Sequence, residues 1–221
     1  MTAPHDNRAR LDAAMARLPL VAILRGLQPH EAAGIGATLE QAGFALIEVP
    51  LNSPQPFDSI ATLRRVLAPE TLVGAGTVTR VDDVERLHAL GADLVVMPHA
   101  DVAVIRAAKA RGMLCVPGVA TPTEAFAALE AGADALKLFP AELVTPGVMK
   151  AMRAVLPRET ALLPVGGVTP ASLRPWRQAG ATGFGLGSAL YAPGDTATAV
   201  SRRAADFVQA WRACTAADPP P

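Results

Sequence analysis

The stretch Gln41-Ala-Gly-Phe-Ala-Leu-Ile-Glu-Val-Pro50 joins the end of a helix-like segment to a short apolar strand. A glycine suits the residue just after a helix, because glycine enters the left-handed conformation at little steric cost. The same pattern recurs at Gly91, Gly112, Gly132 and Gly180, each of which precedes another short strand. This repetition predicts helices that alternate with buried parallel strands.

Three further apolar segments lack the glycine but fit the same rhythm, which brings the expected strands to eight. Their positions are 20–24, 45–50, 71–74, 93–98, 113–117, 134–140, 161–165 and 182–187. The spacing of roughly 20–28 residues leaves room for one helix and two short loops between strands. The sequence therefore predicts an α/β fold of the (β/α)8 TIM-barrel type, with a doubly wound open sheet as the alternative.

The chain is expected to form a single domain over residues 1–221, because no linker-like segment divides it. A helix over about residues 6–17 precedes the first strand, and the core covers about residues 18–213. The last helix is predicted over about 196–215, with Val200, Ala204, Phe207 and Trp211 on one face. Residues 216–221 are expected to be a disordered tail.

The composition bounds the function. The formal net charge is zero and no basic block is present, which argues against nucleic acid or an anionic membrane as the main partner. The apolar runs are too short for a transmembrane helix. Cys115 and Cys214 suggest a reducing cytoplasm without a disulfide framework. Four scattered histidines show no metal-ligand spacing, so no metal and no cofactor are predicted.

Lys137 is one of only three lysines and interrupts an apolar run that is predicted to be a buried strand. Burying an ammonium group is unfavourable unless it is paired or its pKa falls until the amine is neutral. A neutral amine in an apolar pocket is the form that a Schiff-base nucleophile needs. The alternative is a structural lysine that reaches the barrel mouth or pairs with an acid.

Glu48 is a second charged residue inside a predicted central strand. Lys137 is its expected partner, so the two could form a structural pair that holds the barrel register. The functional alternative is a general acid/base beside an amine nucleophile, which indicates carbonyl chemistry.

Further polar residues and glycines follow the strands, at the barrel end where such enzymes carry their active sites. Arg25 could neutralise a carboxylate or phosphate, or lie on the surface. Thr77 could bind a carboxylate, or only cap the next helix. Two glycine-rich turns could bind phosphate through backbone N–H groups and a short helix N-terminus, or be simple tight turns; they contain Gly166, Gly167, Gly187 and Ser188.

Read together, these segments resemble the small class I aldolases that cleave 2-keto-3-deoxy-6-phosphosugar acids. The matching motifs are Arg25-Gly26, the strand around Glu48, 74–77, Pro117-Gly118, 135–140, Gly166-Gly167 and 185–188. The resemblance implies Lys137 as the Schiff-base lysine and Glu48 as general acid/base. It also implies substrate contacts from Arg25, Thr77, Gly166, Gly167, Gly187 and Ser188, and a homotrimer.

Within that family, Asn52, Ser53 and Val165 resemble the branch that acts on 2-dehydro-3-deoxy-6-phosphogalactonate. They are the candidate specificity residues, because the galactonate and gluconate substrates differ only at C4. The expected products are pyruvate and D-glyceraldehyde 3-phosphate. The alternatives are the phosphogluconate/4-hydroxy-2-oxoglutarate branch, a phosphosugar epimerase or isomerase, and a non-catalytic phosphosugar-binding protein.

Overall fold

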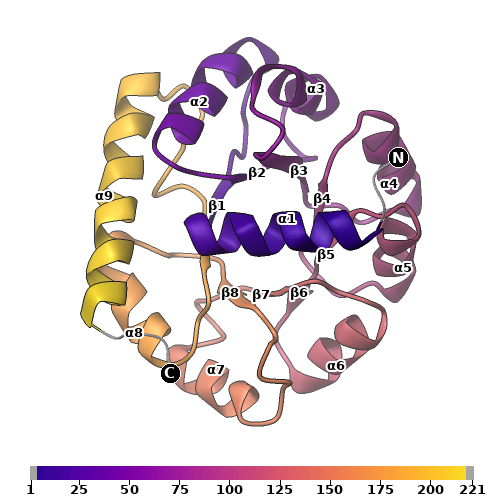
Figure 1. Cartoon of the computed structure of the whole chain (residues 1–221), viewed down its shortest axis with the longest axis vertical. Helices are drawn as coiled ribbons and strands as arrows, with labels where there is room; N and C mark the ends of the chain where they lie inside the picture. Colours follow the sequence, from indigo (N-terminus) through magenta and orange to yellow (C-terminus); the bar gives the residue numbers. More distant parts are fainter. Residues whose placement is uncertain (1–3, 218–221) are drawn as a thin grey trace.

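The computed structural model describes residues 4–217 and contains a barrel of parallel strands surrounded by helices (Figure 1). The strands are β1 (Leu20–Ile23), β2 (Leu46–Pro50), β3 (Leu72–Gly76), β4 (Leu94–Val96), β5 (Leu114–Val116), β6 (Gly118–Val119), β7 (Leu136–Leu138), β8 (Leu162–Pro164) and β9 (Phe184–Leu186). The helices are α1 (Pro4–Arg17), α2 (Pro29–Gln41), α3 (Pro56–Val66), α4 (Val81–Ala89), α5 (Val102–Ala110), α6 (Pro122–Glu130), α7 (Pro146–Arg153), the 3-10 turn η1 (Pro170–Ser172), α8 (Leu173–Gln178) and α9 (Ala197–Ala217).

The strand pairing confirms the predicted barrel and excludes the open sheet. Six strands pair in the order β5-β4-β3-β2-β1-β9, and three more in the order β6-β7-β8. The strand predicted at 113–117 corresponds to β5; β6 continues its direction beyond Pro117, which lacks an N–H for the ladder, and was not predicted. Asp134 N–H still donates to the Cys115 carbonyl across this break, and a Val165–Gly185 bridge joins β8 to β9. The sheet is therefore closed.

The glycines that follow the helices have the backbone conformation that the sequence pattern predicts. Gly43 after α2 has φ +103° and Gly112 after α5 has φ +69°. Other helices begin with side-chain caps, as at Thr121, which accepts from the Glu124 N–H while the Glu124 carboxylate accepts from the Thr121 N–H. These local signals fix where each helix begins and ends, and so where each strand enters the barrel.

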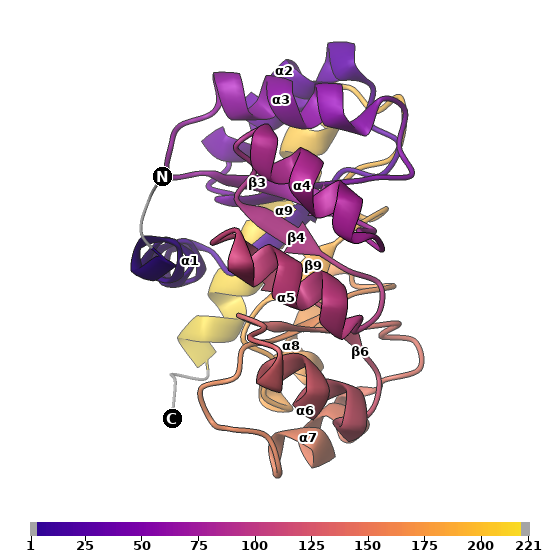
Figure 2. The ribbon, with the colours of Figure 1, turned by 90° about the vertical axis from the view of Figure 1, so that its right-hand side faces the viewer.

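The apolar residues form two layers. An outer layer fills the space between the strands and the surrounding helices, and an inner layer fills the barrel together with Leu11 and Ala14 of α1. α1 crosses the N-terminal ends of the strands, over the middle of the ring in Figure 1 and end-on at one side in Figure 2. The opposite barrel end carries the loops that follow the strands.

The two predicted terminal helices are present. α9 buries Val200, Ala204 and Phe207 and half-buries Trp211, as its apolar periodicity indicates. The predicted disordered tail began at residue 216. This start was wrong, because α9 continues to Ala217. Residues 218–221 of that expected tail lie outside the described residues. No helix among residues 4–217 combines the length and the apolar character needed to cross a membrane.

Candidate active site

Lys137 and Glu48 face each other across the barrel interior. Glu48 lies on β2 and Lys137 on β7, and these strands lie on opposite sides of the closed ring. Both side chains point inward, where they line a small internal void with the inner-layer residues. The exposed fractions are 2% for Glu48 and 6% for Lys137. The structure therefore brings together the two residues that the sequence singled out.

The Glu48 carboxyl is held in an environment that favours its protonated form. Burial raises its pKa from 4.5 to about 7, although the positive charges of Lys137 and Arg25 act in the other direction. Its Oε2 atom has no hydrogen-bond partner among the described residues. A carboxyl that titrates near neutral pH can both take and give a proton, as a general acid/base must.

The Lys137 amine is shifted the opposite way. Burial lowers its pKa, Glu48 raises it, and Arg25 lowers it further. The Nζ atom lies 4.5 Å from the centre of the Phe139 ring. No Lys137–Glu48 ion pair within 4.0 Å is formed in the described part of the chain. The two groups interact electrostatically but do not form a structural salt bridge.

Arg25 extends from the end of β1 and is held by the loop after β2. Its Nη1 atom donates to Asn52 Oδ1 at 2.6 Å, and the next backbone N–H, of Gly26, donates to Ser53 Oγ at 2.9 Å. Gly26 has φ +83°, and a Cβ there would lie 2.5 Å from Cγ of Pro193. The loop that carries Arg25 is thus fixed from both sides, while the guanidinium stays exposed at the barrel mouth.

Thr77 directly follows β3 and has φ +56°, a conformation that β-branched residues rarely adopt. The idea that it caps the next helix is wrong, because α4 begins after Arg80. Strained backbone of this kind persists where the surroundings enforce it and is concentrated at functional sites. Thr77 is half-buried and lies at the end of the barrel where the strands end, as expected, and it does not cap α4.

The two glycine-rich turns are neighbours on the rim, because the Val165–Gly185 bridge joins the strands that precede them. Gly166 and Gly167 form a left-handed turn with φ +117° and +59°. A Cβ on Gly187 would meet no atom within 4 Å, so the space beside this residue is open. The structure places no helix directly after Gly187 and Ser188; a turn follows instead, and α9 begins only at Ala197.

The family model for KDPG and KHG aldolases matches residues 11–199. The chain belongs to this aldolase family. It is 48% identical over 197 residues to the 2-dehydro-3-deoxy-6-phosphogalactonate aldolase of Escherichia coli (strain K12), over 89% of this chain and 96% of that relative. A solved "Native KDPGal structure" has a TM-score of 0.89 and 46% identity, over 90% of this chain and 97% of the other. The 2-dehydro-3-deoxy-phosphogluconate aldolase of Treponema pallidum (strain Nichols) is 30% identical over 155 residues, 70% of this chain and 73% of that relative.

Three residues beside the site of this KDPG/KHG-family aldolase were missed in the sequence. A Cβ on Gly76 would lie 1.7 Å from Glu48 Oε2, so a glycine makes room for the carboxylate. Phe139 contacts the Lys137 amine, and the Glu142 carboxylate lies against the Gly166–Gly167 turn. The motif 74–77 contained a signal for Gly76, because a second glycine before Thr77 indicates close approach by another group. Nothing in the sequence pattern indicates the other two contacts.

Proposed function

We propose that this chain is a class I aldolase that cleaves 2-dehydro-3-deoxy-6-phospho-D-galactonate to pyruvate and D-glyceraldehyde 3-phosphate. The observation that carries the proposal is the buried amine of Lys137 opposite the buried carboxyl of Glu48, with pKa values shifted in opposite directions. Family membership and the 48% identity to a phosphogalactonate aldolase support the same reaction.

The reaction begins when the neutral Lys137 amine attacks the C2 ketone of the substrate. The resulting carbinolamine loses water to give an iminium ion, which accepts the electron pair of the C3–C4 bond as that bond breaks. Glu48, through a water molecule, takes the proton of the C4 hydroxyl, and glyceraldehyde 3-phosphate leaves. Glu48 then helps to return a proton to C3 of the enamine, and hydrolysis releases pyruvate.

The residues at the barrel mouth hold the two charged ends of the substrate. Arg25 and Thr77 bind the C1 carboxylate, because the Arg25 guanidinium and the Thr77 hydroxyl and backbone amide can donate to it. The backbone N–H groups around Gly166, Gly167 and Gly187, with the Ser188 hydroxyl, bind the phosphate at the far end. The adjacency of these two turns supports the placement.

The closest competing substrate is 2-dehydro-3-deoxy-6-phosphogluconate, the C4 epimer. Asn52, Ser53 and Val165 select the galactonate form in this proposal. Val165 is nearly buried and lies beside Glu48 and Lys137 in the lining of the barrel interior, where it offers no hydroxyl to the substrate. The greater identity to the phosphogalactonate relative than to the phosphogluconate relative supports this choice.

The decisive experiment is reduction of the protein with borohydride in the presence of pyruvate, followed by mass spectrometry of the digest. A pyruvate-derived adduct is expected on the peptide that contains Lys137, and it should be lost in Lys137→Ala. Lys109→Ala is the matched control, because Lys109 is paired with Asp134 on the outer side of the barrel. Phosphosugar binding without any lysine adduct would instead favour an epimerase or isomerase.

Four further parts of the proposal concern the working state. One barrel domain carries the whole site, no metal or cofactor is needed, and the protein works in the cytoplasm as a homotrimer. The exposed apolar side chains Phe126, Val148 and Val155 on and beside α6 and α7 support an interface between copies. Light scattering after size exclusion tests the trimer, and assays with a chelator test the absence of a metal.

A further inference from the structure

The floor below Lys137 and Glu48 is a nearly empty and otherwise apolar space. The internal void has a volume of about 20 Å³, which is room for about one water molecule. Apart from the two charged residues, its lining consists of apolar side chains and one glycine: Leu11, Met15, Val21, Ile23, Leu46, Leu94, Val96, Val116, Ala135, Leu163, Val165 and Gly185. Its polar lining consists only of the Glu48 carboxyl and the Lys137 amine, so a water molecule in the void would have no other polar partner.

Two of the lining side chains do not come from the barrel. Leu11 and Met15 project from α1, and Leu11 is 5% exposed. They reach the void from the N-terminal ends of the strands, opposite the mouth through which the substrate enters. α1 thus supplies the bottom of the active site from a segment that precedes the first strand of the barrel.

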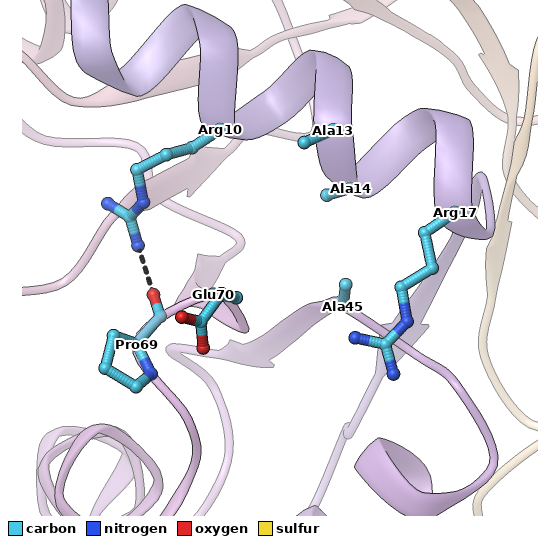
Figure 3. Close-up of a pocket in the computed structure, with 7 residues that line it drawn as sticks. All are labelled: Arg10, Ala13, Ala14, Arg17, Ala45, Pro69 and Glu70. Carbon is cyan, nitrogen blue, oxygen red and sulfur yellow. Dashed lines mark hydrogen bonds between the residues drawn. The ribbon is translucent and has the colours of Figure 1, made fainter.

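Solvent lies close to the other side of this floor. Figure 3 shows a cavity between α1 and the barrel, with Arg10 and Arg17 at its two ends. It has a volume of about 420 Å³, and its wall includes Ala14 and Ala45, which also belong to the inner apolar layer. The cavity therefore borders the same apolar layer that surrounds the void.

Polar contacts in the N-terminal half of α1 hold this helix over the N-terminal end of the barrel. Arg10 donates to the Pro69 carbonyl at 2.7 Å, drawn in Figure 3, and to Asp93 Oδ1 at 2.7 Å. The Asn7 side chain donates to the Gly112 carbonyl. These contacts join the helix to the loops before β3, β4 and β5, and they leave the apolar face of α1 pointing into the barrel.

We propose that α1 is a plug that keeps the floor of the active site dry, and that Leu11 and Met15 are positioning residues that maintain the reactivity of Lys137 and Glu48. The inference rests on the proposed aldolase function. Desolvation is the largest cause of the pKa shift of Glu48 and of the pKa shift of Lys137. Water that enters from below would favour the ammonium and the carboxylate, and so would lower the fraction of nucleophilic amine at neutral pH.

Few other charges act on the pair. Arg25 approaches from the mouth, at the end of β1, and the two groups act on each other. On α1, Arg10 and Arg17 lie beside the outer cavity, and Arg10 is already paired with Asp93. A change at Leu11 or Met15 therefore alters hydration without removing a charge that faces the pair.

The test measures the rate of borohydride-trapped imine formation from pyruvate as a function of pH, in Leu11→Ala and Met15→Ala. The acidic limb of the profile is expected to move up by about one pH unit, which makes trapping about tenfold slower on that limb. Leu87→Ala on α4 is the matched control, because Leu87 is fully buried but lies in the outer apolar layer. The acidic limb of the pH profile of Leu87→Ala should not move.

The proposal would be wrong if Leu11→Ala and Met15→Ala lost the same fraction of the rate at every pH, or if Leu87→Ala showed the same shift. The role of α1 would then be packing only. Leu11→Met refills the space and should restore the wild-type profile. Leu11→Val covers the case in which the alanine variant does not fold. If the wild type forms no imine, the proposed function fails instead; acetic anhydride labelling of Lys137 across pH then tests the plug alone, with the same expected shift.

Discussion

Gly76 at the end of β3 leaves the space in which the Glu48 carboxylate of the neighbouring strand lies, since a Cβ there would approach Oε2 to 1.7 Å. β2 and β3 pair in parallel over their whole length, so neither backbone can move away easily. The absent side chain on one strand therefore sets the position of the carboxylate on the next. The local backbone of Gly76 is not left-handed, so contact and not backbone strain explains the glycine.

Gly76→Ala should displace the Glu48 carboxylate while Lys137 keeps its place across the barrel. We expect turnover to fall by about 10²-fold, because a misplacement of about 1 Å can have this effect on catalysis. Pyruvate imine formation should change much less. Steady-state kinetics and borohydride trapping on the same preparation check this; equal losses in both would contradict the assignment. Gly34→Ala is the control, since a Cβ on Gly34 would meet nothing within 4 Å.

Glu48→Gln keeps the shape of the side chain but removes its proton transfer. Cleavage should slow by about 10²–10⁴-fold, the usual contribution of a well-placed acid/base. The imine with pyruvate should still form, since Lys137 attacks the ketone itself. The ratio of the cleavage rate to the trapping rate is the readout. Full activity in this variant would show that another group carries the proton.

The same substitution should stabilise the protein at higher pH. Because the folded pKa of Glu48 is raised to about 7, the carboxyl contributes stability below pH 4.5 that is lost as the pH rises through about 7. Glutamine does not ionise, so the difference in melting temperature between Glu48→Gln and the wild type should grow between pH 4.5 and 7 and then level off. Thermal unfolding across pH measures this. A constant difference would mean that Glu48 is ionised throughout.

Asn52 is expected to act through Arg25, to which it is hydrogen-bonded at 2.6 Å. Asn52→Ala should raise KM for the sugar acid by about five- to tenfold, with little effect on kcat, because Arg25 loses its orientation. In an Arg25→Ala background the same change should have no further effect. Additive losses in this double-mutant cycle would show that Asn52 contacts the substrate directly.

Val165 offers the sharpest test of substrate choice, because threonine has nearly the same shape. Val165→Thr adds a hydroxyl beside Gly185, whose absent Cβ would lie 2.6 Å from the Val165 Cγ2 atom. We expect the ratio of kcat/KM for the galactonate and gluconate epimers to move by about tenfold toward gluconate. Assays with both epimers measure the ratio. An unchanged ratio would show that residues other than Val165 decide between the two C4 epimers.

Much of this site could be predicted without coordinates. A lysine and a glutamate inside otherwise apolar strands are conspicuous, because charged groups are rarely buried without a reason. The regular helix–glycine–strand pattern placed both residues in a barrel and at the correct strands. It could not show that Lys137 and Glu48 stay apart without an ion pair, since side-chain separation depends on which strands become opposite when the sheet closes.

The sequence by itself determined the strand order in the chain, the barrel, the family and the two charged residues inside the barrel, because each is encoded in local periodicity or in residue type. The tertiary structure alone decided which other residues set the position and the burial of these side chains. The contacts of Gly76 with Glu48, of Asn52 with Arg25 and of Leu11 with the void join segments far apart in the chain. Such contacts arise only when the barrel closes and α1 docks, and the desolvation that shifts both pKa values arises with them.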